Sequence, residues 1–371
     1  MQTLRRAAIL GVGLIGGSLG LRWRQQGVVD RVVGFGRTRA HLERAVELGA
    51  VDEIAADLPE ALRGADLVVL AAPVGTCLQL GPRVAALADP ASLITDVGST
   101  KKALALIMAE ALKARGQGAP HFIGGHPMAG AERAGVEAAD PLLFEQAVWA
   151  LCPAAGTPED VLGRMVALVE ATGAHPLLLD PEQHDRRVAA VSHLPQLAAV
   201  ALAEAAGLAA QEDPELLAMA GGGFRDTTRI AQSPASMWLD VLATNREAVL
   251  EQMDALAALL DHMRAALADE DQDAIREHFA RAAAVRQRVP ARQKGLLPRY
   301  HDLVLYVPDR PGVIGALCLA LGERQINVQD IEILRLREGE GGTLRLGFAR
   351  DDLAQAALGV LTDLGYRAQQ R

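Results

Sequence analysis

The chain has 371 residues, of which 50% are hydrophobic and 22% charged, and its formal net charge is -9. These values describe an ordinary globular chain of two or three domains. The acidic balance argues against a nucleic-acid-binding protein, which would usually carry a basic patch. Three cysteines, Cys77, Cys152 and Cys318, lie far apart without paired spacing, which fits a reducing compartment and indicates no structural metal. No uninterrupted apolar run of about eighteen residues occurs, so we expect no membrane span.

The first apolar stretch, AILGVGLIGGSLGL at 8–21, follows two arginines and could belong to a secretion signal or to a nucleotide-binding turn. A secretion signal needs a small-residue cleavage site after its apolar run, whereas this chain continues with a polar helical face. The glycines form G-x-G-x-x-G between a predicted strand and a predicted helix, which is the dinucleotide-binding arrangement. We therefore predict a cofactor turn. Its predicted binding residues are Gly11, Gly13, Leu14, Ile15 and Gly16.

Short β-branched runs alternate with amphipathic helical stretches from residue 5 to about residue 180. This alternation predicts a Rossmann-like α/β domain at 1–180, with parallel strands joined by crossover helices. The end of one predicted strand places Ala72 and Pro73 in the predicted cofactor site. The predicted strands are AAIL, RVVGF, ADLVVLAAP, ASLITDVG, PHFIGG and AVWALCP.

The strands disappear from Pro181 to about Gly295, where alanine and leucine recur at helical spacing. These apolar faces exceed what a lone appendage needs, so we expect an all-α dimerisation domain at 181–295, and a homodimer. The stretch VPARQKGLLPR has two prolines and a glycine and is predicted to be a linker. Beyond it, residues 300–371 follow the pattern β-α-β-β-α-β of a small ferredoxin-like α+β domain, with EGEGG as a hairpin turn.

The end of the second predicted strand bears on the identity of the cofactor. An NAD site usually places an acidic residue about twenty positions past the fingerprint, where it accepts hydrogen bonds from the ribose. Here that position holds Gly36, followed by Arg37, Thr38 and Arg39. Two guanidinium groups and a hydroxyl could hold the 2′-phosphate of NADP, and the alternative is that both arginines are solvated at a helix start. We favour NADP, and NAD stays open.

Two further stretches, TDVGSTKKA at 95–103 and FIGGHPMAGAERAG at 122–135, follow predicted strands at the edge where sites of α/β sheets lie. Ser99 precedes a helix and can cap it, which does not exclude a second role. His126 stands between glycines and Pro127 in a rigid loop, where an imidazole can accept a proton. The alternative for His126 is a structural histidine bonded to backbone. Ser99 and His126 are the candidate catalytic residues.

The chain resembles the prephenate dehydrogenase family along nearly its whole length. The resemblance rests on five ordered motifs: GVGLIGGSLG, DVGSTK, GGHPMAGAE, VSHLPQ at 191–196 and GGGFRDTTRIAQSPASMW at 221–238. It implies oxidative decarboxylation of prephenate to 4-hydroxyphenylpyruvate, with hydride transfer to NAD(P), in tyrosine biosynthesis. Two alternatives remain, an arogenate dehydrogenase that makes tyrosine directly and a noncatalytic amino-acid sensor that kept the dinucleotide fold.

The resemblance also implies roles for single residues. His126 is the base that accepts the proton of the ring hydroxyl, and Ser99 hydrogen-bonds that hydroxyl and positions His126. Arg229 binds a substrate carboxylate, and Glu132 and Asp226 pair with it as a gate.

Four more substrate-site residues follow from the resemblance. Ser192 and His193 line the pocket and Trp238 closes it, although His193 and Trp238 could instead be helix core. Gln196 stands where many relatives have a histidine. Arogenate carries an ammonium group where prephenate has a keto oxygen, so an acidic residue would favour arogenate, and neutral Gln196 leans toward prephenate.

The tail at 302–371 resembles an ACT regulatory domain through VPDRPGVIGAL. This resemblance implies that tyrosine binds at a domain interface and lowers activity, and the alternative is an oligomerisation domain without a ligand. We expect a cytoplasmic enzyme with no metal, no nucleic acid and no membrane partner.

Overall fold

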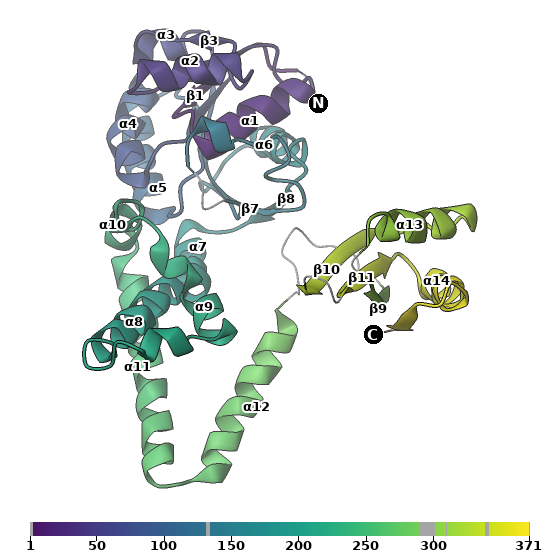
Figure 1. Cartoon of the computed structure of the whole chain (residues 1–371). Helices are drawn as coiled ribbons and strands as arrows, with labels where there is room; N and C mark the ends of the chain where they lie inside the picture. Colours follow the sequence, from purple (N-terminus) through teal and green to yellow (C-terminus); the bar gives the residue numbers. More distant parts are fainter. Residues whose placement is uncertain (1–2, 131–133, 290–300, 309, 338–340, 371) are drawn as a thin grey trace. The chain divides into compact units, whose positions relative to one another are not determined.

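The chain divides into two compact units, Met1–Gly295 and Leu296–Arg371. The predicted domains 1–180 and 181–295 both fall in the first unit. The predicted linker at 289–299 lies, except for Val289, outside the described residues. Figure 1 shows the helices and strands of the computed structural model. It describes residues 3–130, 134–289, 301–308, 310–337 and 341–370.

The first unit contains an eight-stranded sheet in the order β3-β2-β1-β4-β5-β6-β7-β8. This is the predicted Rossmann-like architecture, and all six predicted strands are present. Two strands, β3 and β8, were not predicted, since β3 has only two residues and β8 contains Pro176, a residue that is unfavourable inside a strand. The strands are β1 (Ala7–Leu10), β2 (Val32–Phe35), β3 (Glu53–Ile54), β4 (Leu67–Leu70), β5 (Leu93–Asp96), β6 (His121–Pro127), β7 (Val148–Pro153) and β8 (His175–Leu178).

Strand β7 runs antiparallel to β6, so the expectation of parallel strands throughout was wrong at this position. A parallel neighbour needs a long crossover connection, usually an α-helix. The described residues between β6 and β7 contain only a 3₁₀ turn, η1 (Val136–Ala138), so the chain returns beside β6 in the opposite direction. The crossover helix α6 (Glu159–Glu170) then makes β8 parallel to β7.

The central strands β1, β4 and β5 are buried on both faces of the sheet, which explains why they read as continuous apolar runs. In β4, Leu67 and Val69 pack into one core cluster, and Val68 and Leu70 pack into the other. Side chains of α1, α2 and α6 complete the first cluster, and those of α3, α4 and α5 complete the second. The remaining helices of this part are α1 (Leu14–Gln25), α2 (Arg39–Glu47), α3 (Leu58–Leu62), α4 (Val74–Leu87) and α5 (Lys102–Arg115).

After β8 the first unit is helical, as predicted (Figure 1). By length and composition alone the helical run Pro181–Ala209 could cross a membrane. This run contains a π-helical turn, and its buried polar side chains belong to the site described below. The elements are α7 (Pro181–Val188), η2 (Ala189–His193), α8 (Leu194–Ala209), η3 (Leu216–Met219), α9 (Gly222–Thr228), η4 (Arg229–Gln232), α10 (Ala235–Thr244), α11 (Arg246–Ala268) and α12 (Gln272–Arg288).

The second unit has the predicted β-α-β-β-α-β order, and its antiparallel sheet has the strand order β10-β11-β9-β12. Its core is formed by leucines of β9 and β11 together with Leu317, Leu321 and Leu361 of the two helices. The predicted EGEGG turn lies at 338–342, and residues 338–340 are outside the described residues. The elements are β9 (His301–Val307), α13 (Val313–Glu323), β10 (Asp330–Arg337), β11 (Gly341–Phe348), α14 (Asp351–Asp363) and β12 (Arg367–Gln370).

Candidate active site and cofactor cavity

A cavity of about 530 Å³ lies at the carboxyl ends of β1, β2 and β4. Dinucleotides bind at this edge of Rossmann-like sheets. Four predicted cofactor residues, Leu14, Ile15, Gly16 and Arg39, do not line the cavity. The predicted residues that line it are Gly11, Gly13, Arg37, Thr38, Ala72 and Pro73.

The glycine turn is closely packed at Gly11 and Gly16 and open at Gly13. Gly11 has a φ of 108°, and a Cβ there would lie 2.5 Å from the carbonyl oxygen of Ala71. A Cβ on Gly16 would lie 2.2 Å from the carbonyl oxygen of Gly11, so only glycine lets α1 pack this closely. Nothing lies within 4 Å of the corresponding position on Gly13. A pyrophosphate could therefore approach the backbone N–H groups at the start of α1, and the turn fits a dinucleotide.

The two arginines after β2 are placed differently. Arg37 lines the cavity, whereas the Nε of Arg39 lies 2.9 Å from Oε1 of Glu43 on the exposed side of α2. Arg39 pairs in this way because Glu43 lies one helical turn further along. Two other basic side chains, His41 of α2 and Arg83 of α4, line the cavity and were not predicted. Neither belongs to a recognisable motif, so only the fold brings them to the cofactor cavity.

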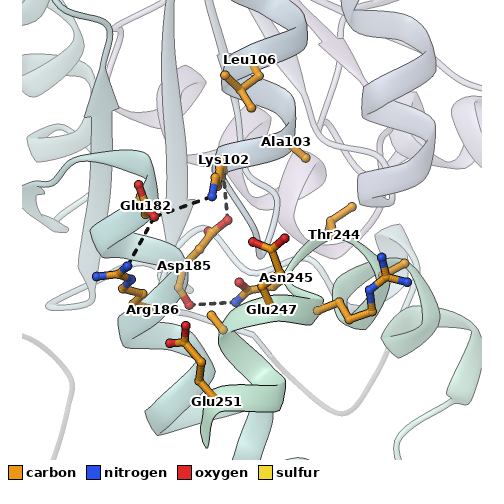
Figure 2. Close-up of a pocket in the computed structure, with 13 residues that line it drawn as sticks. Lys102, Ala103, Leu106, Glu182, Asp185, Arg186, Thr244, Asn245, Glu247 and Glu251 are labelled. Carbon is orange, nitrogen blue, oxygen red and sulfur yellow. Dashed lines mark hydrogen bonds and ion pairs between the residues drawn. The ribbon is translucent and has the colours of Figure 1, made fainter.

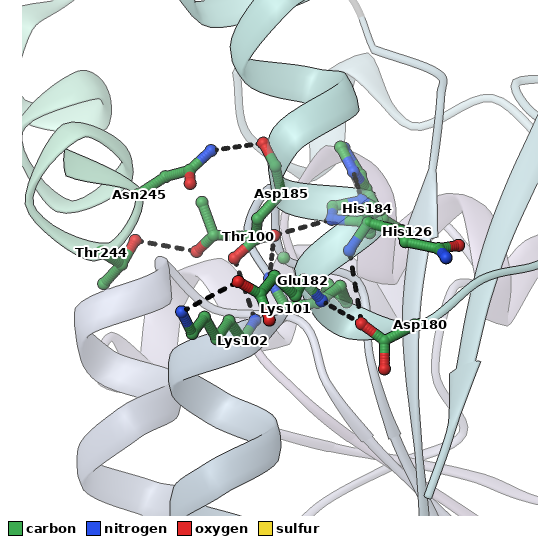
Figure 3. Close-up of polar contacts among 12 residues, drawn as sticks. Thr100, Lys101, Lys102, His126, Asp180, Glu182, His184, Asp185, Thr244 and Asn245 are labelled. Carbon is green, nitrogen blue, oxygen red and sulfur yellow. Dashed lines mark hydrogen bonds and ion pairs between the residues drawn. The ribbon is translucent and has the colours of Figure 1, made fainter. Parts of the chain in front are cut away.

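His126 lies near the carboxyl end of β6 and is hydrogen-bonded at one ring nitrogen (Figure 3). Its Nδ1 lies 2.9 Å from Nε2 of His184 on α7, and the two rings meet edge to face at 5.1 Å between centroids. Burial, followed by the positive charge of Lys101, lowers the pKa of His126 well below its ordinary value of 6.5. A neutral imidazole at physiological pH can accept a proton, so His126 has the state that a general base needs.

His184 is held in turn by Asp185. Its Nδ1 lies 2.8 Å from Oδ1 of Asp185, and both residues are buried. The same carboxylate accepts the backbone N–H groups of Lys101 at 2.7 Å and Lys102 at 3.0 Å, at the start of α5. Asp185 therefore occupies the capping position that the sequence suggested for Ser99. The possible helix-capping role of Ser99 is not seen, because α5 begins two residues later than Ser99 requires and its N-cap residue is Lys101.

A buried ion pair fixes the strand that carries His126. The ammonium group of Lys101 contacts Oδ2 of Asp96 and donates a hydrogen bond of 2.7 Å to the carbonyl of Gly125. Oδ1 of Asp96 accepts the N–H of Gly125 at 3.1 Å. The residue directly before His126 is therefore bonded through both its N–H and its carbonyl, so the backbone at His126 is rigidly held.

His193 is linked to the same network through Asn245. The Nδ2 of Asn245 donates to the carbonyl of Asp185 at 2.8 Å and faces Nδ1 of His193 at 3.2 Å. Burial lowers the pKa of His193 to about 4. Its ring packs edge to face on Trp238 at 5.8 Å, and among the described residues the buried Nε1 of Trp238 has no partner. His193 and Trp238 thus pack against each other, and Asn245 links His193 to Asp185.

Helix α10, which carries Trp238, is tied to the nucleotide-binding part at two points. Asp240 accepts the N–H of Gly75 at the start of α4 at 2.9 Å, and the hydroxyl groups of Thr100 and Thr244 lie 2.8 Å apart. Trp238 therefore belongs to an element that also contacts the helix beginning at the cofactor cavity.

The remaining predicted substrate residues lie on the outer helices. The Nε2 of Gln196, on α8, donates to the carbonyl of Ile230 at 2.9 Å, next to Arg229. Arg229 and Asp226 are exposed at the junction of α9 and η4, and Ser192 is half-buried in η2. The predicted residue Glu132 lies outside the described residues.

A second cavity, of about 330 Å³, is lined by residues of α5, α7, α10 and α11, and Asp185 is one of them. Figure 2 shows its charged lining, in which Glu182 pairs with Lys102 at 3.7 Å and with Arg186 at 3.5 Å. Asp185 and Asn245 both reach this lining. Solvent can therefore approach the network from a region outside the cofactor cavity.

Comparison with known proteins identifies the family. Residues 19–178 match the family model of the prephenate dehydrogenase nucleotide-binding domain, and residues 180–281 match that of the prephenate dehydrogenase dimerization domain. The chain belongs to the prephenate dehydrogenase family. It is 34% identical over 345 residues to the prephenate dehydrogenase of Bacillus subtilis, covering 93% of this chain and 92% of that protein.

Other relatives carry related activities in their names. The cyclohexadienyl dehydrogenase of Zymomonas mobilis is 30% identical over 288 residues, or 77% of this chain and 96% of that protein. The prephenate dehydrogenase of Aquifex aeolicus, solved with hydroxyphenyl propionate and NAD+, has a TM-score of 0.71 and 29% identity, covering 78% and 99% of the chains. Synechocystis arogenate dehydrogenase has a TM-score of 0.66 and 28% identity, covering 76% and 99%.

Sequence reasoning missed His184, Asp185 and Asn245. The first two stand side by side in the polar stretch PEQHDRR, which precedes a helical run rich in alanine and leucine, and this contrast is a signal that could have indicated them. Asn245 offered no such signal, because its role depends on the short break between α10 and α11 that brings it under Asp185.

Proposed function

We propose that the protein oxidises and decarboxylates prephenate to 4-hydroxyphenylpyruvate in tyrosine biosynthesis. The observation that carries this proposal is His126, a neutral imidazole at the same edge of the sheet as the dinucleotide cavity, with its Nδ1 already hydrogen-bonded to His184. A base held in this way leaves its other nitrogen for the substrate. When bound, the nicotinamide dinucleotide accepts the hydride from the substrate.

His126 takes the proton of the ring hydroxyl while the carbon that bears this hydroxyl loses its hydride. The ring carboxylate then leaves as CO₂, its bonding electrons make the ring aromatic, and the proton returns to the ring oxygen. This sequence is strongly downhill, so the protein needs to orient the substrate and supply one base. Ser99 is the hydroxyl that we assign to hold the ring oxygen beside His126.

Prephenate is a dianion, so an acidic protein must offer it local positive charge. Arg229 is our candidate for the substrate carboxylate, with Asp226 and Glu132 as its gate. Asn245 donates to Nδ1 of His193, so neutral His193 carries its proton on Nε2 and serves as a donor. Ser192 completes the pocket together with Trp238, whose Nε1 has no hydrogen-bond partner in the described part of the chain.

Prephenate is favoured over arogenate by the absence of a carboxylate at Gln196. Its amide nitrogen already donates to Ile230, which leaves the amide oxygen as the remaining polar group. Steady-state assays that cross prephenate and arogenate with NAD and NADP test the function directly. Turnover of prephenate with either cofactor supports it, and absence of turnover with all four pairs would favour the noncatalytic sensor.

NADP is the cofactor that the cavity favours. Arg37 and Thr38 line it just after β2, His41 and Arg83 add two basic groups, and Gly36 supplies no carboxylate to repel a 2′-phosphate. NAD remains the competitor, and titration of the protein with NADPH and NADH compares the two without catalysis.

A homodimer and a regulated C-terminal unit complete the proposal. The helical part leaves apolar side chains exposed, and burying them would require a dimer interface above about 2,000 Å². Light scattering at micromolar concentration checks this, and calorimetric titration checks whether tyrosine binds the C-terminal ACT-like unit. Three free cysteines fit a cytoplasmic location. The exposed apolar residues of α8 and α11 include Leu202, Leu208, Leu250, Met253, Leu259, Leu260, Met263 and Leu267.

A further inference from the structure

We infer that Asp185, acting through His184, is a positioning residue that fixes which nitrogen of His126 carries the proton. The inference rests on the proposed function, in which His126 is the base. It concerns the chain of contacts His126–His184–Asp185, with nitrogen-to-nitrogen and nitrogen-to-oxygen distances of 2.9 and 2.8 Å (Figure 3).

The direction of these hydrogen bonds is set at the Asp185 end. Its two oxygens already accept the backbone N–H groups of Lys101 and Lys102, and a backbone N–H can only donate. The start of α5 also stabilises a negative charge at this position. An ionised carboxylate has no proton to give, so Nδ1 of His184 must be the donor in its contact with Asp185.

The orientation then passes through the imidazole ring. A neutral His184 that carries its proton on Nδ1 has a lone pair on Nε2, and this lone pair faces Nδ1 of His126. Nδ1 of His126 must therefore carry the proton and donate it. The Nε2 of His126 is left with the lone pair, which is the atom that can accept a proton from a substrate hydroxyl.

Asn245 gives His193 the opposite arrangement. Its Nδ2 donates to the carbonyl of Asp185, so this atom is a nitrogen and cannot accept from His193. His193 therefore accepts at Nδ1 and carries its proton on Nε2. Asp185 thus contributes to both arrangements. Its carboxylate, through His184, makes Nε2 of His126 a proton acceptor. Its carbonyl accepts a hydrogen bond from Asn245, the residue that leaves the proton of His193 on Nε2.

Without Asp185, His126 could carry its proton on either nitrogen. In the form with the proton on Nε2 it cannot act as a base, and the equivalent fault in serine proteases costs about four orders of magnitude in kcat. The loss here should be smaller, since alanine removes the bias without imposing the wrong form. We expect Asp185→Ala to lower kcat at least about 30-fold, with KM and the dissociation constant of NADH changed less than about threefold.

The matched control is Glu182→Ala, which removes a carboxylate one turn earlier on α7. Glu182 pairs with Lys102 and Arg186 on the exposed side of the helix and has no contact with either imidazole in the described structure. We expect this variant to keep kcat within about twofold, as for most exposed ion pairs. An equal loss of kcat in both variants would attribute the effect to α7 as a whole and overturn the inference.

The direct readout is the tautomer itself. Two-bond ¹H–¹⁵N correlation spectra of the ¹⁵N-histidine-labelled full chain distinguish a proton on Nδ1 from one on Nε2, and the His126→Asn spectrum assigns the His126 signals. We expect Nδ1–H at His126 in the wild type and a mixture of forms in Asp185→Ala. The wild-type spectrum needs no variant to fold, and Nε2–H at His126 there would overturn the inference.

The two levels of the proposal separate cleanly. If His126→Asn retains activity, the proposed function loses its base. If His126→Asn is inactive while Asp185→Ala keeps kcat within threefold of the wild type, the function stands and the positioning role of Asp185 is wrong.

Discussion

The site has two polar regions of opposite construction. Around His126 the polar groups are buried and bonded to one another, and the chain from Asp185 to His126 reaches back to the start of a helix. Around Arg229 the side chains are exposed, on the short elements α9 and η4. Buried networks hold atoms at fixed positions, whereas exposed arms can adjust to a ligand. Chemistry and anion binding are thus assigned to regions with different rigidity.

The largest effect should follow from replacing His126, the last residue of the buried hydrogen-bonded chain. We expect His126→Asn to lower kcat by about two to four orders of magnitude, the usual contribution of a positioned base, with little change in cofactor affinity. End-point assays with long incubation times measure the residual rate of prephenate oxidation. His121, exposed at the start of the same strand, provides the matched control, and His121→Asn should be nearly silent. Activity of His126→Asn within threefold of the wild type would remove His126 from the mechanism.

A substitution in the exposed region around Arg229 should mainly weaken substrate binding. Arg229→Ala should raise KM for prephenate by about 10- to 100-fold, because a charge-assisted hydrogen bond to a carboxylate contributes roughly 1.5–3 kcal/mol. The effect on kcat should be much smaller. Initial rates over a wide range of prephenate concentrations separate the two parameters, and an unchanged KM would move the anion site to another residue.

The contrast between the two regions also explains what the sequence could reveal. Six of the eight strands of the first unit, its glycine turn and the order of elements in the C-terminal unit follow from local sequence patterns, and these were predicted. His126 and Arg229 belong to motifs. His184, Asp185 and Asn245 matter only because α7 packs against the start of α5, and no local pattern encodes a contact between residues 84 positions apart. Arg83 of the cofactor cavity could not be predicted for the same reason.

The cofactor cavity offers a third test, because Arg37 lines it and is also exposed. If the proposed NADP preference is correct, Arg37→Ala should weaken NADP binding about tenfold and leave NAD nearly unchanged, because the guanidinium group that we assign to the 2′-phosphate is lost while solvent screens part of its contribution. Fluorescence titration with NADPH and NADH measures both. Equal weakening of the two cofactors would place Arg37 away from the 2′-phosphate.

The burial of His126 predicts a specific pH dependence. Burial and the charge of Lys101 lower its pKa, so the imidazole stays neutral, and able to accept a proton, at pH values below 6.5. His184 and His193 act in the same direction. At pH 6.0 the enzyme should keep most of its plateau kcat/KM, whereas an ordinary histidine would keep about a quarter. A pH profile whose acid limb lies at or above 6.5 would contradict the buried environment.

The smallest effect is expected at Arg39, where the sequence and the structure differ. The sequence grouped Arg39 with Arg37 as a phosphate ligand, but its guanidinium pairs with Glu43 and does not line the cavity. An exposed i,i+4 pair contributes only about 0.3–0.5 kcal/mol. Arg39→Ala should therefore keep NADP affinity within about twofold, and Glu43→Ala should match it. If Arg39→Ala instead weakened NADP tenfold and spared NAD, the guanidinium would have to leave Glu43 for the phosphate, and the sequence prediction of two arginines would be the correct one.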